Sequence, residues 1–198
     1  FADETAGESM APGGGSIAAY VGTLGVSLGT MVANLSAHKA GWDDQWEFFS
    51  NWAVKGQAYK EQLLFLVDED THAFNKIIDG FRMPKDTDDE KEARALAIEN
   101  ATIYATEIPF KVMETAFQSM EVMQAMLKDG LQNSLSDAGV GVLCARTAVI
   151  GAYFNVRINA KDIKNREFAE KILAKAASIY KQTIAIENDT IAYIDSKM

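Results

Sequence analysis

Helical periodicity is the feature of this sequence that most limits its fold. Apolar residues recur at three- and four-residue steps through most of the chain, no sustained two-residue alternation is visible, and there are only three prolines. This pattern is typical of amphipathic helices packed on one another and argues against a sheet. The sequence therefore predicts an all-α fold, a bundle of about five long helices over residues 15–39, 43–80, 88–129, 135–159 and 166–197.

The third predicted helix has the clearest boundaries. Thr87 followed by Glu90, after Pro84, is the pattern of a capping box, and Gly130 stands where a helix would end. Pro109 lies inside the same segment and removes one backbone donor, but apolar periodicity resumes after it. We therefore expect Pro109 to kink this helix and not to end it.

Size and charge limit the number of domains and the classes of partner. With 198 residues and 48% hydrophobic content the chain can build one core, so we expect a single domain over residues 1–198. The formal net charge of -9 has the wrong sign for neutralising phosphates, so nucleic acid is not an expected partner. The one cysteine, Cys144, is expected to be a small buried apolar residue, which fits a reducing cytoplasm.

One segment is long and apolar enough to raise the question of a membrane. Residues 17–37 carry no charge over 21 positions, and a span needs roughly 20 residues. Glycine, serine, threonine and asparagine dilute this run and no comparable partner span exists, so we expect a buried core helix and no membrane. The chain opens at Phe1 without a secretory signal, and we expect the true N-terminus to lie upstream.

The first predicted helix carries a stripe of small residues beside its apolar stripe. The small residues are Gly15, Ala18, Gly22, Gly25, Gly29, Ala33 and Ser36. The fourth helix has a matching set, Gly141, Cys144, Ala148 and Gly151. Because small side chains allow two backbones to approach closely, we expect these two helices to pack together, within a subunit or across a dimer. A chance scatter of small residues is the alternative.

A carboxylate interrupts the apolar face of the second predicted helix. That face comprises Leu63, Leu66, Ala73, Phe74 and Ile77, and a step of about 100° per residue places Asp70 in its middle. Burying an ionised carboxylate is costly unless it is paired or its pKa rises. We therefore interpret Asp70 as a candidate proton-transfer group. A structural ion pair or a bond to a helix end is the alternative.

A glycine-rich segment leads into the first helix. After Pro12 it consists of Gly13, Gly14, Gly15 and Ser16. Its backbone can approach a ligand closely, and the free N–H groups of a helix start attract anions. It lacks the Gly-Lys-Ser/Thr ending of a nucleotide-binding loop. We expect it to lie near a ligand, with a plain flexible entry loop as the alternative.

The fourth helix supplies three further candidates. Asp137 is either an ordinary first-turn acid or a ligand contact at the head of the small stripe. Asn155 and Asn159 share one helix face and could present amides to a heterocycle or satisfy nearby backbone. His38 and His72 lie on different helices without metal-ligand spacing, so we expect neither a metal nor covalent catalysis.

Six segments together resemble one known family. They are PGGGS at 12–16, MVANL at 31–35, LVDEDTHAF at 66–74, FRMPKDTDDEK at 81–91, SDAGVG at 136–141 and GAYFNVRIN at 151–159. Each motif alone is weak, but their order and spacing are specific and cover nearly the whole chain. The sequence resembles the cyclodeaminase domain of formiminotransferase-cyclodeaminase and its stand-alone methenyltetrahydrofolate cyclohydrolase relatives.

The resemblance implies a cytoplasmic homodimer, or higher oligomer, with sites near the subunit interface and no metal or redox cofactor. It implies a tetrahydrofolate derivative as substrate, in one-carbon metabolism and histidine degradation. In the family, the domain closes 5-formiminotetrahydrofolate to 5,10-methenyltetrahydrofolate with loss of ammonia, while the relatives interconvert methenyl- and 10-formyltetrahydrofolate. A formiminotransferase domain or protein is then an expected partner.

The family's functional residues map onto the positions singled out above. The catalytic aspartate falls on Asp70, the expected general acid/base. The expected substrate-binding residues are Gly13, Gly14, Gly15, Ser16, Lys39, Asp137, Asn155 and Asn159. This chain departs from the family where His38-Lys39-Ala40 keeps one of two basic residues, and where Leu131 replaces asparagine after Gly130. Both departures bear on the choice of folate and on the grip on an anionic tail.

Three functions stay open from the sequence. The first is a folate cyclodeaminase, and the second is a cyclohydrolase on the same scaffold, since the two activities share these motifs. The third is a non-catalytic folate-binding or dimerisation module, which the missing basic residues suggest. Rates on the two folates separate the first two, and binding without turnover would identify the third.

Overall fold

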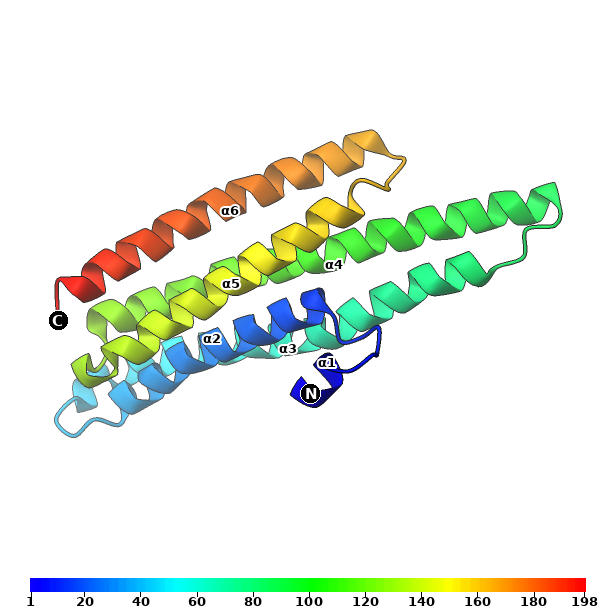
Figure 1. Ribbon diagram of the computed structural model, residues 1–198. Coiled ribbons are helices and arrows are strands. Elements are labelled where there is room, and N and C mark those ends of the chain that lie inside the picture. Colours follow the sequence, from blue (N-terminus) through cyan, green and yellow to red (C-terminus); the bar gives the residue numbers. More distant parts are fainter.

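The computed structural model describes residues 1–198, and all of its regular elements are helices (Figure 1). The α-helices are α1 (Ala2–Thr5), α2 (Gly14–Ala37), α3 (Trp46–Arg82), α4 (Asp88–Asp129), α5 (Leu135–Asn159) and α6 (Arg166–Asp195). Short 3-10 turns, η1 (Asp43–Gln45) and η2 (Gln132–Ser134), precede α3 and α5. The prediction of an all-helical fold with five long helices is confirmed. The four-residue α1 was not predicted.

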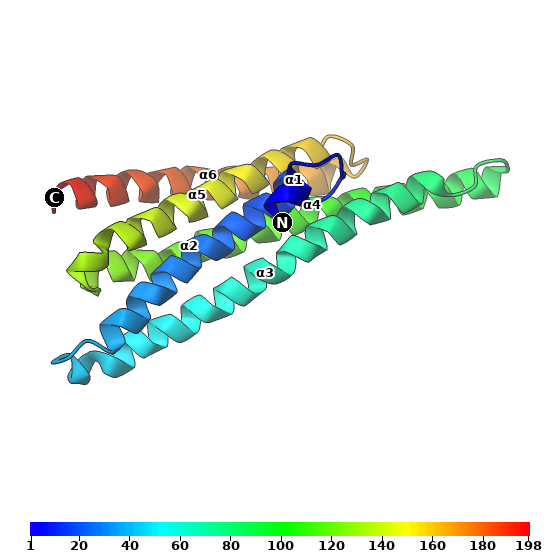
Figure 2. The same ribbon diagram turned by 60° about the horizontal axis from the view of Figure 1, so that its bottom comes forward.

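Helix α2 packs against α3, α4 and α5, and helix α4 packs against all four of the other long helices. Helix α6 lies on the outside and packs mainly on α5. The end of α3 and the start of α4 continue beyond the other helices as a two-helix arm, which both ribbon views show (Figures 1 and 2). The N-terminal segment with α1 returns alongside the start of α2, where the aromatic rings of Phe1 and Tyr20 lie 5.0 Å apart.

The predicted signals at the ends of α4 are confirmed. The Thr87 hydroxyl accepts a hydrogen bond from the Glu90 backbone N–H, and the Glu90 carboxylate accepts one from the Thr87 N–H. Gly130 is the C-cap. The helix runs through Pro109 without ending, as expected, and the kink at that residue stays a prediction.

Helices α2 and α5 pack antiparallel through their small residues, as predicted, and they do so within one chain. A Cβ atom added at Gly25 would lie 2.7 Å from the carbonyl oxygen of Gly141, and one added at Gly141 would lie 2.8 Å from that of Gly25. A Cβ at Gly22 would meet Ala148 at 3.0 Å. The two backbones are therefore in direct contact, which only small residues allow.

Helix α2 is a core helix, as expected. Residues 132–159, which contain α5, are also long and apolar enough to cross a bilayer by length and composition alone, so the expectation that no comparable second segment exists was wrong. In the most apolar window of α2, 61% of the residues are buried inside the bundle, which is typical of a central helix. An exposed apolar strip remains along these two helices and is called the α2–α5 face here: Leu24, Met31, Leu35, Val140, Leu143, Phe154 and Ile158.

Candidate active site

Asp70 lies about two-thirds of the way along α3, where the N-terminus of α2 meets it. The Ser16 hydroxyl donates a hydrogen bond to Oδ2 of Asp70 across 2.8 Å. Ser16 is fully buried and Asp70 is partly buried. The sequence placed Ser16 among the substrate contacts, but its hydroxyl is directed at the carboxylate, so its visible role is to hold Asp70.

Gly15 is the reason why the carboxylate can lie on the first turn of α2. A Cβ atom at Gly15 would overlap both carboxylate oxygens of Asp70. Gly13 is the N-cap of α2 in an extended conformation, and no side chain of α2 caps that end. The positive end of the helix dipole, with its free N–H groups, therefore faces the carboxylate.

The carboxyl group of Asp70 is held in the environment that proton transfer needs. Burial raises the pKa of Asp70 above its ordinary value of 3.8, and hydrogen bonding from Ser16 opposes that rise without cancelling it. Asp70 therefore has both features: the hydrogen bond to a helix end that a purely structural role would need, and the raised pKa that a proton-transfer role would need. An acid with this balance can be loaded with a proton closer to neutral pH than a free aspartate.

Asn155 and Asn159 reach the same place from the end of α5. Nδ2 of Asn155 donates to the Gly151 carbonyl across 3.0 Å, and Nδ2 of Asn159 donates to the Ala105 carbonyl of α4 across 2.6 Å. The Nδ2 group of each asparagine therefore already donates a hydrogen bond to the protein backbone. The carbonyl oxygen Oδ1 of each has no protein partner among the side-chain hydrogen bonds, so both asparagines can offer an acceptor to a ligand.

These groups surround one small cavity of about 150 Å³. Its lining includes Gly13, Gly14, Gly15, Asp70, Asn155 and Asn159, together with the apolar side chains of Phe74, Ile77 and Met10. Sites for drug-sized ligands usually measure roughly 300–1,000 Å³. The cavity therefore encloses only part of a larger ligand, and the remainder must lie outside it.

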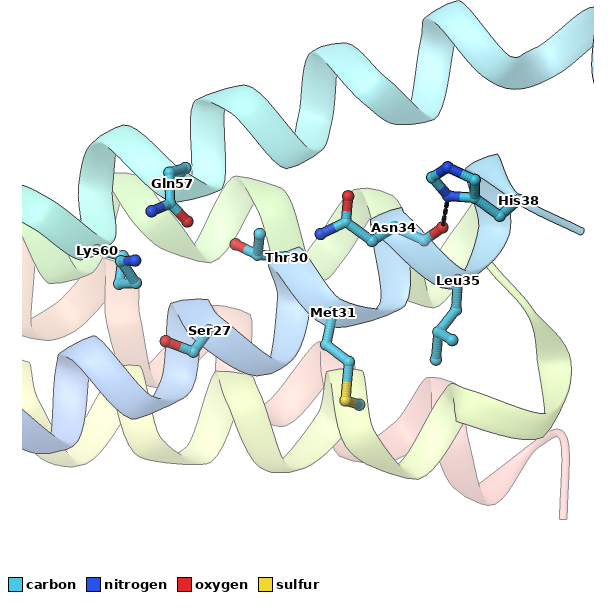
Figure 3. Close-up of a pocket in the computed structure, with 8 residues that line it drawn as sticks. All are labelled: Ser27, Thr30, Met31, Asn34, Leu35, His38, Gln57 and Lys60. Atoms are coloured by element: carbon cyan, nitrogen blue, oxygen red, sulfur yellow. Dashed lines mark hydrogen bonds between the residues drawn. The ribbon is translucent and has the colours of Figure 1, made fainter.

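A larger hollow lies elsewhere on the chain. It is an open groove of about 580 Å³ between α2 and α3, where Ser27, Asn34, His38, Gln57 and Lys60 are grouped (Figure 3). The nearest of its α2 residues, Ser27, lies about 16 Å along that helix from Ser16. No carboxylate lines the groove, so we place the candidate active site at Asp70.

Lys39 and Asp137 do not lie at this cavity. Lys39 follows α2 and stacks its ammonium 4.0 Å from the Trp42 ring, at the end of α2 opposite to Gly15. Asp137 lies in the first turn of α5, about 27 Å along the helix from Asn155. The structure thus gathers most of the predicted site at one end of α2 and α5 and leaves these two residues at the other.

Sequence reasoning missed four residues of the cavity wall. Met10, Ala11 and Thr71 line it, and none of them stood out from the sequence. Ala105 lines it as well, and its carbonyl oxygen accepts the hydrogen bond from Asn159. A signal for Ala105 was available, because Pro109 lies four residues later and cannot donate the usual helical hydrogen bond.

The histidines do not belong to the cavity. His72 pairs with Glu69 across 2.9 Å, and His38 bonds the Asn34 carbonyl at the same distance. Nowhere in the chain do three His, Cys, Asp or Glu side chains gather in an arrangement suited to a metal ion.

The chain matches one family over most of its length. A family model described as Formiminotransferase-cyclodeaminase matches residues 1–178. The formimidoyltransferase-cyclodeaminase of Mus musculus is 34% identical over 182 residues, which are 92% of this chain and 34% of the mouse protein. The chain thus spans about a third of the length of that relative.

Two further similarities extend over whole proteins. The methenyltetrahydrofolate cyclohydrolase of Methylorubrum extorquens is 30% identical over 198 residues, which are 100% of this chain and 95% of the relative. The crystal structure of a formiminotetrahydrofolate cyclodeaminase from Thermotoga maritima superposes with a TM-score of 0.86 at 21% identity, covering 99% of this chain and 94% of the other. That superposition supports the helical architecture described above.

Proposed function

The chain belongs to the formiminotransferase-cyclodeaminase family, and we propose that it closes 5-formiminotetrahydrofolate to 5,10-methenyltetrahydrofolate with release of ammonia. The observation that carries this proposal is the carboxyl group of Asp70 on α3. It is partly buried against the first turn of α2, and its pKa is raised. The mouse and Thermotoga maritima relatives are named for a cyclodeaminase, which supports the same reaction here.

Ring closure requires proton transfers that Asp70 is placed to make. The 10-nitrogen of the folate attacks the carbon of the protonated formimino group, –CH=NH2+, and a C–N bond forms to give a tetrahedral adduct that carries an –NH2 group; the positive charge ends on the methenyl product. Asp70 takes the proton from the 10-nitrogen and delivers it to the former formimino nitrogen. The bond between that nitrogen and the carbon then breaks and ammonia leaves. General acid–base catalysis of this kind contributes roughly 10²–10⁴-fold.

The polarity of the cavity suits a substrate edge rich in N–H groups. Asp70 offers carboxylate oxygens, and Asn155 and Asn159 each offer Oδ1, while no Lys, Arg or His side chain lines the cavity. Acceptors of this kind pair with the N–H groups of an aminopyrimidine ring or of a formimino group. The residues thus bind and orient the heterocycle while Asp70 moves the proton.

A cyclohydrolase is the second candidate function. It is favoured by the match with the Methylorubrum extorquens cyclohydrolase, which covers both proteins nearly end to end. In that reaction Asp70 would take a proton from a water molecule that attacks the methenyl carbon. The same acid–base group serves both reactions, so only the substrates distinguish them.

Paired assays with two variants test this proposal. Purified protein is given 5-formiminotetrahydrofolate or 5,10-methenyltetrahydrofolate, with methenyl absorbance and ammonia as readouts. Asp70→Asn should reduce turnover on the preferred folate by two or more decades. Asp68→Asn, on an exposed position of the same helix, is the matched control and should stay active. A wild-type protein that converts neither folate would refute the proposal, and so would an active Asp70→Asn.

We also propose that two copies of the chain associate through the α2–α5 face. Exposed apolar side chains grouped along two helices that pack on each other are typical of an interface. If the two-fold axis of the dimer runs perpendicular to α2 and α5, the N-terminal end of each helix in one chain lies beside the C-terminal end of the same helix in the other chain. Lys39 and Asp137 of one chain would then lie beside the Asp70 cavity of the other, where the part of the folate that the cavity cannot enclose would extend.

Two measurements test the dimer. Phe154→Glu should convert the protein to a monomer in light scattering, whereas Val54→Glu, on an exposed position of α3, should leave the dimer intact. Mixing inactive Asp70→Asn with Asp137→Asn, through unfolding and refolding, should restore activity, because one of the two shared sites becomes complete. No recovery from two separately inactive variants would argue against a site shared between chains.

The wider setting follows from the same proposal. Because the mouse relative is named as a transferase joined to a cyclodeaminase, we place a formiminotransferase, as a domain or as a separate protein, as the partner that supplies the formimino folate. The tetrahydrofolate derivative is the substrate and no further cofactor is invoked. The reaction is assigned to the cytoplasm.

A further inference from the structure

Pro109 creates a free carbonyl in the wall of the active-site cavity. In an α-helix the carbonyl of residue 105 accepts a hydrogen bond from the N–H of residue 109. Pro109 has no N–H, although α4 continues through it and the residue is buried. Ala105 is one of the residues that line the cavity, and its carbonyl therefore needs a donor from elsewhere.

Asn159 supplies that donor. Its Nδ2 lies 2.6 Å from the Ala105 oxygen and donates to it across the α4–α5 contact. The chemistry fixes the direction of this amide, because a backbone carbonyl can only accept. With Nδ2 anchored, Oδ1 is left as the group that can meet a ligand in the cavity shared with Asp70.

We infer that Pro109 is a positioning residue, which frees the Ala105 carbonyl so that Asn159 is locked with its oxygen toward the substrate. An alanine at position 109 would donate to the Ala105 carbonyl within α4 and compete with Asn159 for it, so the amide would be held less firmly and could turn by 180° to present either end. The lock makes the cavity select an N–H-bearing edge of its ligand. The identity of the ligand rests on the proposed function, whereas the lock, meaning the hydrogen bond that holds Asn159 on the Ala105 carbonyl, does not.

The first test needs no ligand. With ¹⁵N-labelled asparagine, the side-chain amide of Asn159 in the wild type should show one downfield proton protected from exchange with solvent. In Pro109→Ala that proton should lose its protection. Pro84→Ala, which removes a proline from the exposed α3–α4 loop, should leave the signal unchanged. An Asn159 amide that is equally protected in Pro109→Ala would overturn the inference.

The second test measures equilibrium binding of 5-formyltetrahydrofolate. Pro109→Ala should weaken binding roughly 3- to 10-fold, the worth of one neutral hydrogen bond. Adding Pro109→Ala to Asn159→Ala should cost nothing further. A full additional loss in the double variant would show that Pro109 acts independently of Asn159, and would contradict the inference. A wild-type protein that does not bind this folate counts against the proposed function and leaves the labelled-amide result to decide on the lock.

Asn159→Asp provides a check that is independent of changes in α4. The aspartate keeps acceptor oxygens of the same shape but cannot donate to Ala105 as a carboxylate. If the anchored N–H matters, Asn159→Asp should bind the folate as weakly as Asn159→Ala. Binding equal to that of the wild type would mean that an acceptor alone is sufficient, and the lock would be refuted.

Discussion

Gly15→Ala should disable the active site while leaving the helix that carries it intact. Gly15 lies in the first turn of α2, where its backbone is helical and readily accepts alanine. The space that the new methyl group would need is occupied by the Asp70 carboxylate. The carboxylate must therefore leave the first turn of α2 and lose its hydrogen bond from Ser16.

The expected change in the free energy of unfolding is small and the expected change in turnover is large, so Gly15→Ala can be told apart from a variant that simply unfolds. Losing a hydrogen bond to a charged group costs roughly 1.5–3 kcal/mol. Alanine for glycine in a helix returns about 1 kcal/mol, and release of the carboxylate into water offsets more. The free energy of unfolding should then fall by less than about 2 kcal/mol, against the 5–15 kcal/mol of a typical domain. Turnover should fall roughly 10²–10⁴-fold, because the proton-transfer group is displaced.

Urea unfolding and steady-state rates on the preferred folate measure the two effects. Gly14→Ala serves as the stability control, since its Cβ would meet nothing within 4 Å. Gly15→Ala added to Asp70→Asn should lower turnover no further, because both changes remove the same group. A Gly15→Ala protein that keeps wild-type turnover would refute the reasoning, as would a double variant with fully additive losses.

Three other outcomes follow from the structure. Gly25→Ala should lower the free energy of unfolding by about 1–3 kcal/mol, since its Cβ would press on the Gly141 carbonyl; an unchanged urea midpoint would contradict this. Thr87→Ala should cost about 1 kcal/mol through loss of the capping box, with turnover unaffected. Because the pKa of Asp70 is raised on folding, its favourable contribution to stability is complete below its unfolded pKa and is lost as pH rises through its folded pKa. Asp70→Asn should therefore gain stability relative to the wild type between acid and neutral pH, and a difference independent of pH would count against the raised pKa.

The helical architecture and the position of Asp70 on an apolar helix face could be predicted from the sequence, because both depend on local spacing. Apolar periodicity places the five long helices, and Thr87 and Gly130 mark the ends of α4. The same period placed Asp70 on an apolar face, where burial raises its pKa. The small stripes predicted the contact between α2 and α5, and the structure decides that this contact lies within one chain.

The rest of the candidate site could not be predicted, because it depends on contacts between residues that are far apart in the sequence. The sequence could not show that Ser16 lies against Asp70, 54 positions away, and so takes the role of a partner of the acid. Helical rise already separates Lys39 from Gly15 and Asp137 from Asn155 along their own helices, but the sequence could not show at which of these ends Asp70 of α3 would lie. The link between Pro109 and Asn159 was hidden for the same reason, because Ala105 and Asn159 are 54 positions apart.

The most direct test of the central claim is a titration of the Asp70 carboxyl itself. Aspartate labelled with ¹³C at the carboxyl carbon is followed by NMR over a range of pH, and Asp70→Asn identifies the signal. The account predicts a pKa above the ordinary 3.8, and a further rise in Ser16→Ala, where an opposing hydrogen bond is gone. A carboxyl that titrates at or below 3.8 would contradict the account, because burial would then not make Asp70 a stronger base than a free aspartate for the proton of the 10-nitrogen.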